Sequence, residues 1–514
     1  MTRKVSVVSL VVVICLLLTT VLMFGCQPKP PDNALKIGQI THLGLPNGVA
    51  GQQVAQVLAG MINDKGGLNV GGEKYQIQLV QYNGKGDQAE VKAAINRLVF
   101  EDKVSFIIGD DNVDVWYPIT EPNNVLISAM SFTPGILSKD NKLSFQTGCI
   151  QSTSQIITGS FIEANPQYKT YCIVLDDSFI GKMVSDTTAA RLKQFPGIEV
   201  IQERYPAGQQ DLSALGTKIK SLNPDVVLPF EMTAVRAIRQ AGWNGPLLSG
   251  FSLSGSSAVT LAGGKEFVEG YYLGGWPVEY DPPLTEKAKE YKAAYTKQKG
   301  KWEDLELTAS LYFTALTAAI EKAGSLDVTK VAAAFENMQW EGPGGPAKMI
   351  NRPDLGQERT VDSITTQYLK RIKDGKSELI TTITPDKGLE VFRRIMGSAP
   401  PPPPATSALP PPAAGSIVPW DQALNLTNFG DKVTVSGVVV DVISFMPPAT
   451  IVFIGEAGGD PMASFPLDIQ DPKPFGDLNS YKGKTVEVTG PLAKNNFTGK
   501  AQLTVTEPSQ IVVK

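Results

Sequence analysis

Acidic, amide and aromatic side chains are concentrated in one short run of the sequence. The run extends from Asp110 to Trp116 and directly follows the apolar residues 106–109. Three carboxylates at the start of a helix suit the helix dipole, but they would oppose a bound anion. The run therefore predicts either a surface for a neutral or cationic group, or a helix start that Asn112 or Asp114 caps.

Histidine is almost absent, which removes most histidine-dependent chemistry. His42 is the only histidine among 514 residues, so multi-histidine metal sites and most histidine-dependent catalysis are excluded. No Gly-x-Ser-x-Gly, Cys-x-x-Cys or P-loop motif is present. The net charge of −4 provides no basic surface for nucleic acid. We therefore expect no enzyme, no metal, no cofactor and no nucleic-acid partner.

The N-terminus has the pattern of a secretory signal. Two basic residues precede the apolar run 5–24, which ends in Gly25 and Cys26. The end of the run is similar to a bacterial lipobox, in which the cysteine is lipidated, although Met23 stands where leucine is usual. The alternative is an uncleaved transmembrane anchor, since about twenty apolar residues can span a bilayer. We predict a lipoprotein signal peptide (1–25), lipid on Cys26, and a flexible tether (26–34).

The body of the chain alternates between strand and helix patterns. Apolar or alternating strands are predicted at 35–40, 75–80, 104–109, 125–128, 171–175, 198–202 and 225–228, and helices at 51–64, 88–100, 183–194 and 212–222. Repeated strand–helix units predict parallel sheets covered by helices, and two successive series predict two such lobes. A proline-rich linker (398–416) separates this body from a tail (417–514).

A series of short motifs in the body resembles the branched-chain-amino-acid type of periplasmic binding protein. They are Leu35–Gly38, Ile62–Gly67, Asp87–Ala89, Phe106–Gly109, Asp211–Ser213, Pro224–Val227, Ala237–Ala241, Glu269–Gly270, Ala319–Gly324 and Trp340–Gly345. The resemblance implies a type I periplasmic-binding-protein fold: two Rossmann-like lobes joined by a hinge, over residues 35–397. By analogy, lobe one comprises about 35–148 and 277–345, and lobe two about 149–276 plus part of 346–397.

The same resemblance implies an extracytoplasmic protein that captures a small-molecule solute by hinge closure and delivers it to ABC permease subunits. The lipid on Cys26 would hold it at the cell membrane. A sensor that reports ligand occupancy to a partner is the alternative. Ligands of the family lie between the lobes, against loops that follow particular strands. These loops predict the following ligand-binding residues: His42, Asp111, Asn112, Val113, Trp116, Ser131, Phe132, Phe179, Phe230, Glu231, Phe251 and Ser252.

Several of these residues depart from the pattern of amino-acid-binding members. The family's hydroxyl cluster after the strand that ends at Gly109 is replaced by Asp110–Trp116. Phe251 and Ser252 stand where an acidic residue usually holds the ligand ammonium, and Glu231 is close enough in sequence to substitute. The departures favour a neutral, apolar or aromatic solute, or a cation, over a plain α-amino acid, within the wider class of amino-acid-like, aromatic or apolar solutes. The alternative is that these aromatic side chains are packing residues.

The tail (417–514) has a strand-rich pattern that resembles a small all-β OB-fold-like barrel. Strands are predicted at 432–443, 450–455, 463–469, 484–490 and 501–505, with glycines inside the first and at the end of the fourth. Seven lysines against ten acidic residues give the tail a net charge of 7 − 10 = −3, which disfavours a nucleic-acid groove.

Cys149 and Cys172, in the body of the chain, could form a disulfide. Cys172 lies in an apolar run, however, and equally fits a buried free thiol.

Overall fold

The computed structural model describes residues 33–131, 137, 141–302, 307–353, 357–397, 416–444, 450–459, 461, 464–469, 471–494 and 501–514. The predicted signal peptide, Cys26, Phe132 and almost all of the proline-rich linker lie outside these residues. Within the described ranges, no helix is both long and apolar enough to cross a bilayer.

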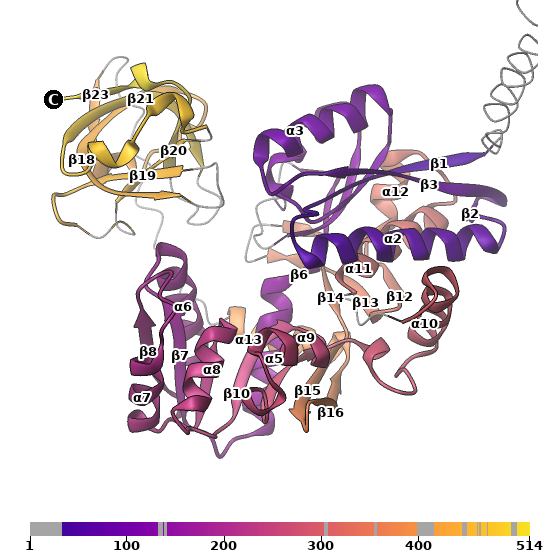
Figure 1. Ribbon diagram of the computed structural model, residues 1–514. Helices are drawn as coiled ribbons and strands as arrows, with labels where there is room; N and C mark the ends of the chain where they lie inside the picture. The colour runs from indigo at the N-terminus through magenta and orange to yellow at the C-terminus, as the bar shows by residue number, and fades with distance from the viewer. Residues whose placement is uncertain are drawn as a thin grey trace, which may run out of the picture.

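A six-stranded sheet forms the first lobe, with strand order β2-β3-β1-β4-β5-β6. Figure 1 labels β1, β2, β3 and β6 of this sheet. All of its strands pair in parallel except β2 with β3. The bounds are β1 Ala34–Thr41, β2 Leu68–Val70, β3 Glu73–Asn83, β4 Phe106–Gly109, β5 Leu126–Ser131 and β6 Ser144–Cys149. The central strands β4 and β5 are buried at every position because helices cover both of their faces.

The helices of the first lobe pack in two groups. One face of the sheet carries α2 (Pro46–Asp64) together with α11 (Thr308–Ala323) and α12 (Val328–Ala334), which come from the third quarter of the chain. The other face carries α3 (Gln88–Asn96), its π-helical continuation η1 (Arg97–Glu101), the short turn η2 (Val113–Val115) and α4 (Tyr117–Thr120). The 3-10 turn η3 (Glu121–Asn123) follows α4.

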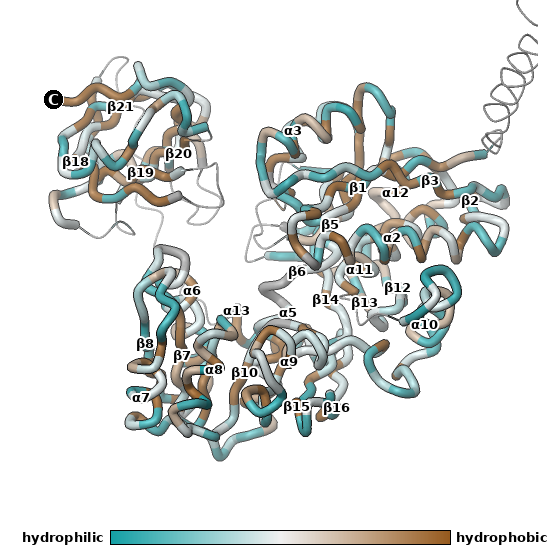
Figure 2. The backbone as a smooth tube through the Cα atoms, viewed as in Figure 1, coloured by the Kyte–Doolittle hydropathy of each residue, from teal (hydrophilic) through white to brown (hydrophobic). Residues whose placement is uncertain are grey.

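The second lobe contains a seven-stranded sheet of order β16-β15-β11-β10-β9-β7-β8. Its bounds are β7 Thr170–Asp176, β8 Glu199–Tyr205, β9 Val226–Pro229, β10 Leu247–Ser252, β11 Tyr271–Gly275, β15 Gln367–Lys373 and β16 Lys376–Ile383. The first five are parallel, and β15 and β16 add antiparallel strands at one edge. Figure 2 shows apolar stretches along the strands of both sheets.

Helices cover both faces of the second sheet as well. One apolar core joins it to α7 (Ser213–Leu222), α8 (Met232–Gln240) and α9 (Gly255–Ala262). The other joins it to α5 (Ile150–Ala164), α6 (Phe179–Leu192) and α13 (Pro385–Gly397). Cys172 is a free, fully buried thiol in the first of these cores, and burial raises its pKa to about 12. The buried-thiol alternative is therefore correct for Cys172.

The chain passes between the two sheets three times. It leaves the first sheet where β6 runs into α5, and it returns from β11 through η6 (Pro277–Glu279) to α10 (Glu286–Lys299). The third passage follows a three-stranded sheet of β12 (Gln339–Gly342), β13 (Gly345–Arg352) and β14 (Gln357–Thr365), after which β15 joins the second sheet. Residues of β13 and β14 contribute to apolar cores of both lobes.

The C-terminal segment forms a closed five-stranded barrel with its own core. The ring order is β18-β19-β20-β22-β21 and back to β18, with β20 and β22 parallel. The bounds are β18 Lys432–Ser444, β19 Thr450–Gly455, β20 Phe465–Ile469, β21 Thr485–Lys494 and β22 Ala501–Val505. The short elements β17 (Ile417–Pro419), α14 (Trp420–Ala423) and β23 (Ile511–Val513) flank the ring.

Candidate functional site

The carboxyl ends of β1, β3 and β4 form one edge of the first sheet. The register aligns Thr41 with Asn83 and Ile40 with Gly109, so the residues that follow these strands lie side by side. His42 and Asp111 were predicted from separate strands, and the structure brings them together at this edge because parallel strands end at the same side of a sheet.

Asp111 holds two of these loops together. Its carboxylate accepts a hydrogen bond from the backbone N–H of Gly86 (3.1 Å) and one from the side-chain amide of Asn112 (2.9 Å). Burial raises the pKa of Asp111, and the Gly86 N–H and the nearby His42 oppose that rise. A Cβ atom added at Gly86 would lie 2.8 Å from the His42 ring, so the imidazole packs directly over this glycine. The oxygens of Asp111 are thus already occupied by the protein.

Asn112 does not act as the predicted side-chain cap. It occupies the left-handed backbone region (φ 45°) before η2, and its side chain makes no capping hydrogen bond. Its amide bonds Asp111 instead. The side chain of Asp114, the other predicted cap, lies outside the described part of the molecule.

Asp110 differs from Asp111 because its carboxyl is not paired. In the described part of the chain it accepts no hydrogen bond and forms no ion pair, and only its backbone N–H is bonded, to the carbonyl of Ile40 (3.3 Å). Burial, with the neighbouring charge of Asp111, raises the pKa of Asp110 to about 7. An unpaired carboxyl with a raised pKa, at the sheet edge where ligands of such folds bind, makes Asp110 a candidate binding residue.

The hydroxyl of Tyr312, in α11, is close enough to Asp110 for its pKa to respond to that carboxyl. The hydroxyl of Tyr312 is fully buried and lies 3.5 Å from the side-chain amide of Gln39, which also donates to the carbonyl of Gly51 in α2 (3.1 Å). Burial raises the pKa of Tyr312 well above its usual value, with a further contribution from Asp110. The sequence analysis did not find Gln39 or Tyr312. A glutamine inside an apolar strand was a signal for the first, whereas nothing local marked the second.

The side chains of Trp116 and Val113 are buried in the core rather than exposed at the sheet edge, and their contact with a solute stays a prediction. Trp116 is fully buried in the core on the face of the first sheet that carries α3 and α4. Its indole N–H donates to the carbonyl of Asp111 (2.9 Å). Val113 is buried in the same core. The turn η2 directs both side chains inward, because the core of this face offers the large apolar volume that an indole needs.

Ser131 and Phe132 follow β5. Ser131 is buried at the last position of that strand, opposite Cys149 of β6. Phe132 lies outside the described residues, so its prediction stands untested.

The second sheet presents a shallow hollow at the ends of β9 and β10. Its lining combines apolar groups with hydroxyls: Ser154, Thr158, Thr188, Leu228, Pro229, Phe230, Leu248, Ser249 and Gly250. Of the predicted residues, only Phe230 belongs to this lining. The hydroxyls were missed because Ser154, Thr158 and Thr188 lie on helices rather than on loops after strands.

The remaining predicted residues of the second lobe have different surroundings. Glu231 is exposed at the start of α8 and lies beside Tyr205 at the edge strand β8, where burial and this carboxylate raise the pKa of the tyrosine. Ser252 ends β10 and packs against Gly274. Phe179 begins α6 and Phe251 lies in β10, but neither side chain is described.

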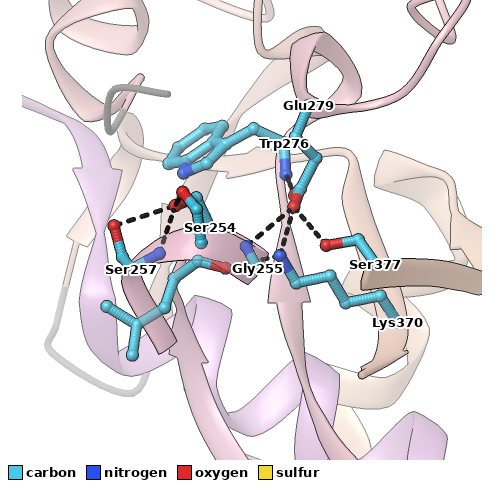
Figure 3. A network of polar contacts seen from close by, with 9 residues as sticks. Ser254, Gly255, Ser257, Trp276, Glu279, Lys370 and Ser377 are labelled. Atoms are coloured by element: carbon cyan, nitrogen blue, oxygen red, sulfur yellow. Dashed lines mark hydrogen bonds and ion pairs between the residues drawn. The ribbon is translucent and has the colours of Figure 1, made fainter. Parts of the chain in front are cut away.

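A buried ion pair fixes the second passage between the lobes (Figure 3). The side chain of Glu279 is 3% exposed and that of Lys370 is fully buried. The Glu279 carboxylate accepts hydrogen bonds from two backbone and two side-chain donors: the N–H groups of Trp276 and Gly255, the hydroxyl of Ser377 and the ammonium of Lys370. The passage is therefore anchored to the second lobe immediately after β11.

The described residues include no group of three or more histidine, cysteine, aspartate or glutamate side chains placed to hold a metal ion.

Comparison with known proteins supports a binding role. A family model described as periplasmic binding protein matches residues 34–362, well over half of the chain. A Leu/Ile/Val-binding protein of Rhizobium johnstonii is 28% identical over 62% of this chain and 88% of its own length. A leucine-, isoleucine-, valine-, threonine- and alanine-binding protein of Pseudomonas aeruginosa is 28% identical over 57% of this chain and 79% of its own.

Solved structures show the same fold. The branched-chain amino acid transporter substrate-binding protein LivJ of Streptococcus pneumoniae, in complex with isoleucine, has a TM-score of 0.53 at 20% identity, covering 68% of this chain and 99% of its own. A solute-binding protein of an ABC transporter from Rhodopseudomonas palustris, in complex with 3,4-dihydroxybenzoic acid, has a TM-score of 0.54 at 18% identity, covering 69% and 98%. These relatives are binding proteins rather than enzymes, and the chain belongs to the periplasmic binding protein family.

Proposed function

We propose that the chain is the extracytoplasmic solute-binding protein of an ABC importer, which captures a small organic solute between its two lobes by hinge closure. The observation that supports this most directly is the unpaired carboxyl of Asp110 at one sheet edge, in a fold whose ligands lie at the carboxyl ends of the strands. The hydroxyl-lined hollow beside Phe230 supplies a second surface at the other sheet.

The chemistry of the two surfaces favours an apolar, aromatic or cationic solute over a plain α-amino acid. The first lobe carries Asp110 and Asp111 where amino-acid-binding relatives hold a carboxylate, and like charges placed together are costly. The second lobe has Ser252 where those relatives hold the ammonium, and Glu231 is turned toward Tyr205 instead.

Thermal unfolding in the presence of defined solutes tests the proposal. We expect a solute of one of these classes to raise the melting temperature of the full chain, because a ligand that binds only the folded state stabilises it by mass action. Leucine, valine, benzoate, benzyl alcohol and benzylamine form a suitable set. Stabilisation by leucine or valine and by none of the others would eliminate the proposed solute class.

Lipid on Cys26 is the proposed attachment to the membrane. It is supported by the basic residues, the apolar run and Gly25 that precede this cysteine. The wild-type chain should appear in the membrane fraction and incorporate labelled palmitate. Cys26→Ser should lose the label, and retention of label in that variant would contradict the assignment.

We further propose that the C-terminal barrel is OB-like and does not bind nucleic acid. The ring order and the parallel pairing of β20 with β22 support the first part, and the charge of −3 supports the second. A single-stranded oligonucleotide titrated at low salt should not bind the full chain. The relatives' names describe solute binding and transport, so they give the alternative role as a sensor no support.

A further inference from the structure

Asp110 stands beside a second polar side chain that has no partner. The register of β1 with β4 pairs Ile40 with Gly109, which places Thr41 next to Asp110. Thr41 is fully buried, and its hydroxyl has no hydrogen-bond partner in the described part of the chain. An orphaned buried hydroxyl costs stability, so such groups concentrate where a ligand or a solvent molecule completes them.

Thr41 and the Tyr312 hydroxyl lie around one glycine of α2. A Cβ atom added at Gly51 would be 3.5 Å from the Thr41 methyl group and 3.3 Å from the Tyr312 hydroxyl. The charge of Asp110 also raises the pKa of Tyr312, after the larger effect of burial. The carboxyl of Asp110, the hydroxyl of Thr41 and the phenol of Tyr312 therefore form one cluster between the edge of the sheet and the two helices that cover it.

The charged and titratable groups around this cluster leave its charge uncompensated. Asp111 adds a second negative charge, but its oxygens already accept from Gly86 and Asn112. His42 packs over Gly86 and acts on the Asp111 carboxylate. Among the described residues, no cation contributes to the surroundings of Asp110, whose pKa is raised by burial first and by Asp111 second. Asp110 is thus the carboxyl at this edge that remains open to a partner.

We infer that Asp110 is a specificity-determining residue that receives the protonated amino group of the solute, so that the substrate class is a small organic amine without a carboxylate. This inference rests on the proposed function. A charge-assisted N–H···O hydrogen bond would supply the missing cation, whereas a carboxylate in the same place would add a third negative charge. The apolar body of the amine would lie against Phe230 and the hydroxyl-lined hollow of the second lobe.

Matched solutes that differ only in their polar group test the inference. Titration calorimetry of the full chain would compare benzylamine with benzoate, tyramine with hydroxyphenylacetate, and isopentylamine with isovalerate. We expect an amine to bind at about pH 8, and its affinity to fall about tenfold or more at about pH 5.5, where Asp110 is protonated. Asp110→Asn should weaken the same amine at least about tenfold at the higher pH and abolish the pH dependence.

The control is Asp64→Asn, which removes an exposed carboxylate at the end of α2 and should leave the affinity unchanged. The melting temperature of Asp110→Asn without solute verifies that this variant is folded. Tight binding of a carboxylate, unaffected by Asp110→Asn, would overturn the inference and leave the proposed function standing. If neither amines nor carboxylates bind but benzyl alcohol does, the inference fails and the proposed function stands. If benzyl alcohol does not bind either, the proposed function fails together with the inference.

Discussion

Glu279 and Lys370 form an ion pair that is almost entirely withdrawn from solvent, although 91 residues separate them in the sequence. Glu279 ends the segment that leaves the second sheet, and Lys370 lies in β15, which rejoins that sheet after the third passage. The pair therefore binds two of the three interlobe connections to the same lobe. If the lobes close as proposed, we expect this connection to bend on the first-lobe side of Glu279.

Breaking this pair should destabilise the protein strongly. Glu279→Gln or Lys370→Met leaves one buried charge without its partner, which typically costs about 3–5 kcal/mol. The double variant should lose less than the sum of the two single losses, because no uncompensated charge remains. Chemical denaturation measures all three losses. Lys289→Met, which removes an exposed ion pair with Glu286, serves as the control and should change stability by about 0–1 kcal/mol. Single-variant losses as small as that of the control would contradict the role assigned to the pair.

Trp116→Phe should affect stability rather than solute binding. The indole N–H bonds the carbonyl of Asp111 within the core, so its loss leaves that carbonyl unpaired and costs about 1–3 kcal/mol. The solute affinity of the folded variant should stay within about twofold of the wild type. A large loss of affinity at unchanged stability would place the tryptophan at the ligand after all.

Asp110 should make the stability of the solute-free protein fall with rising pH. Its pKa is raised from 3.8 to about 7, so ionisation is penalised in the folded state. The stability that the neutral form retains is lost as pH rises from about 4 to about 7. Asp110→Asn removes this loss. Because the side chain is partly exposed, the full pKa shift overstates the effect. We expect the free energy of unfolding of the variant to exceed that of the wild type by roughly 1–2 kcal/mol at pH 8, and by near zero at pH 4. Thermal unfolding at both pH values measures it, and a variant less stable than the wild type at pH 8 would contradict the unpaired state.

The C-terminal barrel should fold by itself. Its core contains only residues between Val418 and Ile511, so residues 416–514 bury their own apolar surface. We expect this fragment to unfold in one cooperative transition, and Leu467→Ala to lower its stability by about 2–5 kcal/mol. A fragment without a cooperative transition would show that the barrel depends on the rest of the chain.

Sequence patterns predicted the elements whose apolar period is clear and missed those whose composition is mixed. The apolar strands β1, β4 and β7 and the periodic helix α2 were all predicted, although α2 begins earlier, at Pro46, because proline is favourable in a first helical turn. The strand β6 was missed because Phe145 and Cys149 are its only apolar residues and Gln146, Thr147 and Gly148 lie between them, so it has neither an apolar run nor a regular alternation.

The sequence allowed prediction only of those residues of the candidate site that directly follow a predicted strand. His42 and Asp111 follow predicted strands, so their meeting at one edge could be anticipated. Tyr312 could not be found in this way, because it reaches Gln39 from 273 residues further along the chain. The direction of Trp116 depends on how the turn η2 packs, which no local pattern specifies.

Hydrogen–deuterium exchange of the full chain, with and without a solute that stabilises it to heat, tests the central claim most directly. A solute held between the lobes should slow exchange simultaneously around Asp110 in the first lobe and around Phe230 in the second, while the barrel from Lys432 onward stays unchanged. Protection confined to one lobe or to the barrel, at saturating solute, would contradict capture between the two lobes.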